Sequence, residues 1–282
     1  MTNGFQPVDG VLKIPEGTLS LPDGEFAGRE DIACVILPET LLDTGLETFS
    51  GCAELREVIF PRALKSIGAA CFAECPKLSK AELTEELLSV GEGAFLNCVS
   101  LKNLRFPETL TEIGAMSFWG TGIEEISIPC GVLSVGEHAF WSCEELRRAD
   151  VPGRGTDIGE NAFGSCYKLT QGYIAPGYPA HGDPPSELLY TLLWCSCPER
   201  HGVEMSRRAE SYIEKNEALI MERIFKYDNI PALNTLVQRG LLSQSGIESY
   251  VRESSAAGKT EMTALLLRAR GKYDNLDGEL EL

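Results

Sequence analysis

Phenylalanine returns at a nearly constant interval along the first 163 residues of the chain. The positions are Phe26, Phe49, Phe72, Phe95, Phe118, Phe140 and Phe163, so the steps are 23, 23, 23, 23, 22 and 23 residues. A period of this length is typical of a solenoid, in which each unit covers the apolar face of the next. The chain is therefore expected to build most of its length from one stacked element.

One unit, read from Phe95, has the pattern F-x-x-C-x-x-L-x-x-L-x-F-P-x-x-L-x-x-I-G-x-x-S-F. The alternating pair Val58 and Phe60 places two side chains inward from a short strand, and the proline that follows ends this strand. The glycine after Ile67, like its equivalents in other units, is expected to allow a turn with positive φ. Each phenylalanine should stack on its equivalents in the neighbouring units.

The same alternation recurs in every unit and predicts a row of eight strands forming one parallel sheet on the concave side. These strands are expected near residues 11–14, 34–37, 57–60, 80–83, 103–106, 125–128, 148–151 and 171–174.

The units resemble the BspA-like leucine-rich repeat family of bacteria, whose pattern is C-x-x-L-x-x-I-x-L-P-x-x-L-x-x-I-G-x-x-A-F, over about residues 10–176. The resemblance implies a right-handed leucine-rich-repeat arc, and many members are surface proteins that bind other proteins or host components. Some positions depart from the pattern: Arg29 and Thr121 replace the cysteine, Thr44 replaces an isoleucine, and Thr84 and Ala175 replace the proline.

Five of the ten cysteines occupy one position of the repeat: Cys52, Cys75, Cys98, Cys143 and Cys166. Cysteine serves there as a small, easily buried apolar residue, so these are expected to be free thiols in the core. A redox ladder is the alternative, but side chains at equivalent positions run parallel, which favours packing.

The repeat pattern stops at a Pro- and Gly-rich stretch, and the period then becomes helical. We expect a solenoid of seven to eight units at 1–176, a linker at 177–185, a helical cap domain at 186–271 that seals the last repeat, and an acidic tail at 272–282. Pro231 is expected at a helix start and Gly240 at a helix end, while Ser245 and Glu248 form a capping box. This third weakly resembles divergent ankyrin helix pairs.

The sequence contains only incomplete matches to nucleotide-binding and metal-binding motifs. Gly258-Lys259-Thr260 lacks the glycine and the strand of a phosphate loop, and the glycines near Gly155 miss the dinucleotide spacing. Cys195, Cys197 and His201 could ligate zinc but have no clear fourth ligand. His138 is expected to be a solvated turn residue. We therefore expect no enzymatic activity, no catalytic residue, no metal and no cofactor.

The formal net charge is −17, which disfavours nucleic acid and anionic membranes as partners. No apolar run is long enough for a membrane span, and residues 1–17 show no secretory signal. The chain as given is expected to be cytoplasmic, unless an upstream signal was removed. Its oligomeric state cannot be read from the sequence.

Two rows of side chains should point outward from the strands and offer a binding surface. In these rows Glu57 with Lys80, Glu82 with Arg105, and Glu125 with Arg148 adjoin across strands, either as stabilising pairs or as a recognition stripe. Cys34, Ile36 and Ile59 form an apolar cluster that is either a partner site or buried beneath the segment around Phe5. The candidate partner-binding residues are Ile36, Ile59, Glu82, Arg105, Arg148 and Tyr173.

These features favour a protein–protein interaction scaffold that binds a protein partner through the concave face. The alternative is a cell-surface adhesin or carbohydrate-binding protein whose export signal is missing from this chain.

Overall fold

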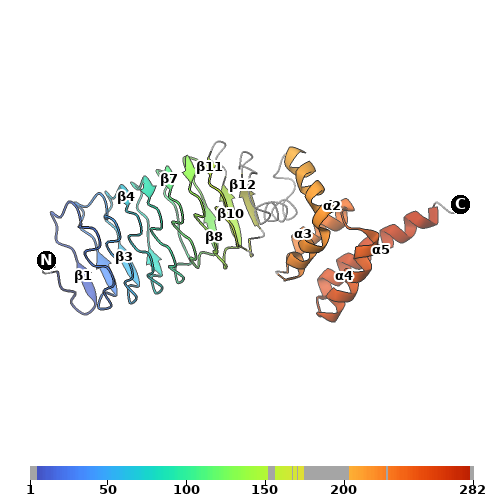
Figure 1. The fold of residues 1–282 in the computed structure, drawn as a ribbon, viewed down its shortest axis with the longest axis horizontal. Helices are drawn as coiled ribbons and strands as arrows, with labels where there is room; N and C mark the ends of the chain where they lie inside the picture. Colours follow the sequence, from blue (N-terminus) through green and yellow to red (C-terminus); the bar gives the residue numbers. More distant parts are fainter. Residues whose placement is uncertain are drawn as a thin grey trace. The chain divides into compact units, whose positions relative to one another are not determined.

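The computed structural model describes residues 5–151, 156–166, 168–169, 171–174, 203–226 and 228–279, with backbone alone for 171–174, 203–208 and 272–279. The linker expected at 177–185 and the candidate zinc ligands lie outside these residues. The chain divides into two compact units, one containing the repeats up to Leu169 and the other containing the C-terminal helices. Each unit is described by itself (Figure 1).

The repeats form a solenoid of short parallel strands, as the sequence predicts. One row of strands holds the alternating residues: β1 (Val11–Lys13), β2 (Cys34–Ile36), β3 (Glu57–Ile59), β5 (Lys80–Ala81), β8 (Glu125–Ser127), β10 (Arg148–Val151) and β12 (Gln171–Ile174). They do not form the single sheet expected from the sequence. One sheet has the order β1-β2-β3-β5 and another the order β12-β10-β8.

The break between these two sheets lies at the coil that contains Asn103. This residue forms only an isolated parallel bridge, to Glu125, where the sequence predicts a full strand at 103–106. Among the described residues, no backbone hydrogen bond joins 79–83 to 102–106. The coil before the break also departs from the pattern, since it has Ala81 where the preceding coil has Val58, and Thr84 in place of the proline.

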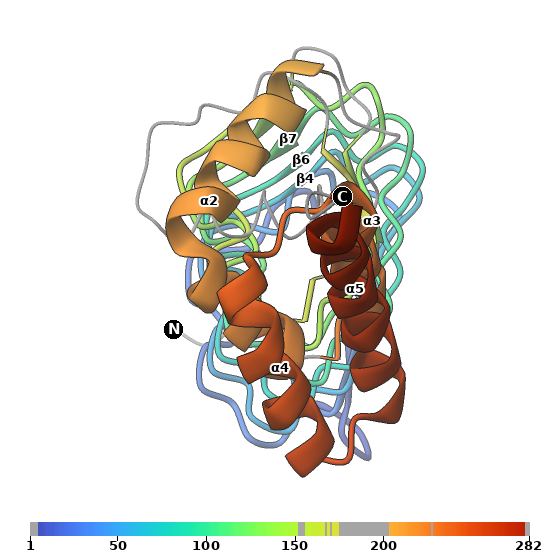
Figure 2. The ribbon, with the colours of Figure 1, turned by 90° about the vertical axis from the view of Figure 1, so that its right-hand side faces the viewer.

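A second row of strands lies where the sequence analysis expects a turn. It consists of β4 (Ser66–Ile67), β6 (Ser89–Val90), β7 (Glu112–Ile113), β9 (Ser134–Val135) and β11 (Asp157–Ile158). These five strands pair in the order β11-β9-β7-β6-β4, and β4, β6 and β7 lie one behind another in the view along the repeats (Figure 2). Neighbouring coils are thus hydrogen-bonded through this row as well as through the first row, except at the break, where of the two rows only the second joins the described coils.

The glycine that follows each of these strands is needed for close approach, which corrects the expectation of positive φ. A Cβ on Gly68 would lie 1.9 Å from the carbonyl oxygen of Gly45, and one on Gly136 would lie 2.3 Å from the nitrogen of Ala115. Positive φ occurs two residues later, for example at His138 with φ 56°. Glycine is therefore required at this position because neighbouring coils approach too closely to leave room for a Cβ atom.

The phenylalanines form one continuous file through the core, as predicted. Successive rings from Phe26 to Phe163 are stacked, with centroids 5.2–5.5 Å apart and interplanar angles of 1–19°. All seven side chains are fully buried. At the N-terminal end the ring of Phe5 packs on Phe26, with centroids 6.3 Å apart, and covers the first rung.

The file continues through a coil that is one residue short. Phe118 and Phe140 are separated by 22 residues instead of 23, yet their centroids lie 5.3 Å apart. The missing residue falls between Phe118 and Ile123, where Gly122 is so close to the preceding coil that a Cβ would lie 2.3 Å from the oxygen of Val99.

The repeated cysteines add a hydrogen bond to each rung. Each thiol donates a hydrogen bond, over 3.0–3.2 Å, to the carbonyl oxygen of the file phenylalanine in the preceding coil, as Cys75 does to Phe49. The donors are Cys52, Cys75, Cys98, Cys143 and Cys166. At the variant position Thr121 the hydroxyl donates instead to Phe118 O within its own coil, at 2.9 Å. The eight described cysteines are free thiols.

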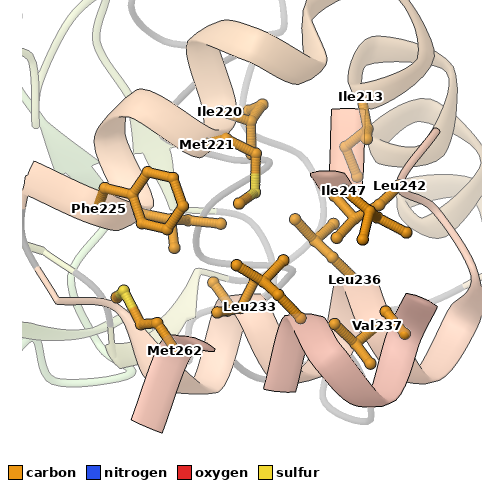
Figure 3. Packing of buried hydrophobic residues seen from close by; sticks show 14 of the residues in the cluster. Ile213, Ile220, Met221, Phe225, Leu233, Leu236, Val237, Leu242, Ile247 and Met262 are labelled. Carbon is orange, nitrogen blue, oxygen red and sulfur yellow. The ribbon is translucent and has the colours of Figure 1, made fainter. Parts of the chain in front are cut away.

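The second unit contains α2 (Val203–Lys226), α3 (Ile230–Arg239), α4 (Gln244–Ala256) and α5 (Thr260–Glu279). Helix α2 is broken at Asn216, which has φ −133°. The core of this unit is apolar and draws residues from all four helices; it includes Ile213, Ile220, Met221, Phe225, Leu233, Leu236, Val237, Leu242, Ile247 and Met262 (Figure 3).

Two of the three predictions about helix ends are confirmed. Pro231 lies in the first turn of α3, and Gly240 ends this helix in the left-handed conformation, with φ 66°. The predicted capping box is wrong, because Ser243 is the N-cap of α4 and accepts a hydrogen bond from Gly246 N at 3.1 Å. Ser245 therefore lies inside the helix.

Candidate functional site

The outward residues of the first row of strands form what we call the strand face. The observed register brings Val11, Cys34, Glu57 and Lys80 into one line, and Lys13, Ile36 and Ile59 into another. Beyond the break at Asn103, Arg148 lies opposite Glu125. The residues predicted to point outward therefore do share one face of the strands.

The N-terminal end of the strand face is apolar. Ile59 is 45% exposed and Ile36 is half-buried beside it on the neighbouring strand. Phe5, the proposed cover, instead packs against Phe26 in the core. Burial, followed by the charge of Glu57, raises the pKa of the Cys34 thiol, so this side chain is neutral and extends the apolar patch.

The predicted charge pairs form only in part. Lys80 Nζ lies 3.7 Å from Glu57 Oε1. Arg148 pairs with Asp150 of its own strand, with Nη2 2.7 Å from Oδ2, and not with Glu125. Glu82 and Arg105 are both exposed, and no ion pair joins them in the described part of the chain.

Glu82 and Arg105 line a groove of about 760 Å³ on the strand face. The groove lies at the break in the sheet, and its walls come from residues 79–83, Glu85, residues 103–105, Glu124 and Glu125. Because β5 has no ladder partner on the side of Asn103, side chains of the two coils border an open channel here. Lys80 and Arg105 supply positive charge and four glutamates supply negative charge, so the channel is polar and mildly acidic.

The candidate residues thus fall into separate places. Ile36 and Ile59 are neighbours at one end, Glu82 and Arg105 share the groove, and Arg148 is held by Asp150. The side chain of Tyr173 lies outside the described residues.

Sequence analysis missed four exposed leucines beside the second row of strands. Leu19, Leu42, Leu88 and Leu133 occupy one position of the repeat and are 73%, 52%, 44% and 68% exposed. Their signal in the sequence is an apolar doublet, as in Leu41-Leu42 and Leu87-Leu88, whose first member is buried and whose second is not. Lys65 and Thr111 occupy this position in the intervening coils, so only Leu19 and Leu42 lie on adjacent coils, and the four leucines do not form one continuous apolar surface.

An aromatic group on the turns was also missed. Trp119 and Trp141 lie on neighbouring coils with ring centroids 5.8 Å apart, and His138 contacts both rings, at 5.6 and 4.8 Å. His138 does occupy a turn, as predicted, but its side chain is only 24% exposed and is not simply solvated. We call this group the aromatic corner.

The buried thiols are poorly suited to chemistry. Burial raises the pKa of Cys52 to about 11 and that of Cys71 and Cys75 to about 12, so the nucleophilic thiolate is scarce near neutral pH. Within the described residues, no group of three or more His, Cys, Asp or Glu side chains is arranged to hold a metal ion. None of the described helices has the length and apolarity required to cross a membrane.

Comparison with known proteins identifies the repeats. The model of the BspA type leucine rich repeat region matches in six copies, over residues 11–121 and 65–177. The chain belongs to the BspA-type leucine-rich repeat family. The match covers more than half of the chain, and the region of resemblance seen in the sequence agrees with it.

Solved structures show the same fold. The leucine-rich repeat protein of T. pallidum is 24% identical with a TM-score of 0.52, over 57% of this chain and 78% of that one. A leucine-rich cell surface protein of Faecalibacterium prausnitzii is 22% identical with a TM-score of 0.54, over 59% of this chain and 48% of that one. No curated protein matches the chain significantly.

Proposed function

We propose that this BspA-type chain is a non-enzymatic scaffold that binds a protein partner through its strand face, centred on the groove at the sheet break. The groove carries the proposal, because it offers charged side chains without internal partners on a rigid support. Arg105 and Glu82 are exposed, face one channel and make no ion pair within the described residues. A partner can therefore pair with them without first breaking an internal contact.

The apolar end of the strand face adds to the proposal. Ile36 and Ile59 lie on β2 and β3, in the same sheet as β5, which borders the groove. An interface with an apolar part next to charged groups matches the usual anatomy of protein–protein contacts. The exposed apolar side chains would supply affinity, and the groove charges would supply specificity.

The experiment is affinity capture from a lysate of the native cells with the full chain and with charge-reversed variants. Glu82→Arg and Arg105→Glu should each remove the same bound protein. The matched controls are Glu112→Arg, in the same coil as Arg105 but on the second row of strands, and Arg62→Glu on an exposed loop. If the groove variants retain every partner of the unchanged chain, the strand-face proposal fails.

A surface adhesin or carbohydrate-binding protein is the second candidate. The description of the F. prausnitzii neighbour as a cell surface protein favours it. A glycan array probed with the full chain separates the two, since a scaffold for proteins should bind no glycan. Surface labelling of intact native cells would detect the chain only if it is exported.

A further inference from the structure

The aromatic corner is built from two successive coils at a position that elsewhere holds small or aliphatic residues. Trp119 and Trp141 each follow a phenylalanine of the file, and the equivalent residues in the other coils are Ala27, Ser50, Ala73, Leu96 and Gly164. Tryptophan is thus absent from the repeat pattern, and among residues 1–176 it occurs only at these two positions, on adjacent coils, with both side chains partly exposed. Core packing does not demand it, because the other coils stack without it.

The rings are held in place by their surroundings. A Cβ on Gly164 would lie 2.3 Å from Cε3 of Trp141, so the indole lies directly over the backbone of the next coil. His138 meets Trp141 edge-on at an interplanar angle of 66°, and its Nδ1 lies 3.1 Å from Glu137 Oε1. The corner therefore presents preorganised aromatic surface next to a carboxylate that is 59% exposed.

The turn segments that form and flank the corner carry acidic charges only. The turn segments 114–121, 136–145 and 159–166 contain no lysine or arginine. They carry Glu137, Glu144, Glu145 and Glu160, of which Glu145 is paired with Lys168. Indole faces attract cations, most often arginine, and nearby carboxylates strengthen this attraction. These three turn segments provide no such cation.

We propose that the aromatic corner binds the guanidinium group of an arginine in a basic segment of a partner protein. A planar guanidinium can stack on an indole face while its N–H groups donate to the Glu137 carboxylate. Lysine satisfies only part of this arrangement, since its ammonium group is compact and strongly hydrated. This site is separate from the groove and does not depend on the proposed function of the strand face.

The test is an NMR titration of the full chain with labelled tryptophan, following the three indole N–H signals. The probe is the peptide acetyl-Gly-Arg-Gly-Arg-Gly-amide, and the comparison peptide has neutral citrulline at both arginine positions. Trp119→Phe and Trp141→Phe assign the signals, and the signal of Trp194 serves as a reference. The proposal expects the arginine peptide to shift the Trp119 and Trp141 signals and the citrulline peptide to leave them nearly unchanged.

Substitution of the carboxylate gives the second arm of the test. Glu137→Gln should weaken binding of the arginine peptide about two- to fivefold, the range for an exposed cation–π or ion-pair contact. Glu108→Gln removes the same charge from an exposed loop away from the corner and should leave binding unchanged. Arg105→Glu in the groove should leave the indole shifts unchanged. The peptide titration therefore tests the aromatic corner alone, and failure of the strand-face proposal would not change its result.

Three results would overturn the inference. One is the absence of indole shifts at millimolar arginine peptide. Another is an equal response to the citrulline peptide, which would indicate neutral stacking of the kind a sugar could make. The third is equal weakening by Glu108→Gln and Glu137→Gln, which would indicate general attraction to an acidic protein.

Discussion

The thiol of Cys75 donates a hydrogen bond to the carbonyl oxygen of Phe49, 3.2 Å away in the preceding coil. The side chain of Phe49 is at the same time stacked on Phe72, which precedes Cys75 by three residues. One small polarizable side chain thus fills core space and also satisfies a buried carbonyl group. This explains why cysteine recurs at this position when neither a disulfide nor a metal site involves it.

The first prediction concerns this hydrogen bond. Cys75→Ala should lower the free energy of unfolding by about 1–2 kcal/mol, because it removes a buried donor and leaves a small void. Cys130→Ala at an exposed site should change stability by less than about 0.5 kcal/mol. Urea denaturation followed by circular dichroism measures both. Equal effects of the two variants would contradict a structural role for the repeated thiol.

The second prediction concerns alkaline pH. Burial raises the pKa of Cys52 to about 11 and of Cys71 and Cys75 to about 12, whereas the ordinary value is 9.0. The unfolded chain therefore releases these protons at lower pH than the folded chain does. Stability of the repeat unit should be constant with respect to these groups below about pH 8 and should fall between about pH 9 and pH 12.

Urea midpoints measured from pH 7 to pH 11 check this dependence. The variant Cys52→Ala, which has one fewer buried thiol, should show a shallower decline than the unchanged chain. A midpoint that rises through this range would show that the buried thiols do not dominate alkaline stability.

The third prediction concerns the close approach of neighbouring coils at the glycine that follows each strand of the second row. Gly136→Ala should cost about 3 kcal/mol or more, because its Cβ would lie 2.3 Å from the backbone nitrogen of Ala115. Gly131→Ala is the matched control, since the nearest atom to its Cβ would be 3.5 Å away. It should be nearly neutral. Thermal denaturation of the two variants should separate them clearly, and similar melting temperatures would refute the steric argument.

The fourth prediction concerns the helical unit. Lys259 donates hydrogen bonds to the carbonyl oxygen of Phe225 and to Asp228, and so ties the start of α5 to the end of α2. Lys259→Met should destabilise this unit by about 1–2 kcal/mol. Lys215→Met, on an exposed part of α2, should have little effect. Hydrogen exchange of the helical amides reports on both variants, and unchanged protection in Lys259→Met would argue against the tie.

The stacked core could be predicted from the sequence, because a constant interval between phenylalanines indicates that the rings of successive coils lie in contact. A ring at Phe72 can be buried only if Phe49 and Phe95 lie above and below it, so period and packing are the same information. The inward strand residues follow from alternation in the same way.

The second row of strands was missed because its residues carry no such alternation. Ser66-Ile67 and Ser89-Val90 are two-residue segments, too short for a period of two to be recognised. The glycine after them was misread for a related reason: a sequence shows that a glycine is present but not which contact excludes a Cβ. Only the position of Gly45 relative to Gly68 distinguishes a conformational from a steric requirement.

The surfaces were only partly predictable. Register placed Glu82 and Arg105 on one face, but the break at Asn103 that opens the groove depends on backbone hydrogen bonds that the pattern does not encode. The aromatic corner was not predicted because Trp119 and Trp141 fall at a variable position of the repeat, for which the pattern specifies no residue type.

The coil from Phe118 to Phe140 shows that vertical alignment does not depend on equal loop lengths. One amino acid is absent from the arc that contains Gly122, and the rings on either side still meet face to face. Alignment is set by the spine, while the outer arcs absorb differences in contour length. The loss of one residue from an arc is therefore compatible with an unbroken file of aromatic rings.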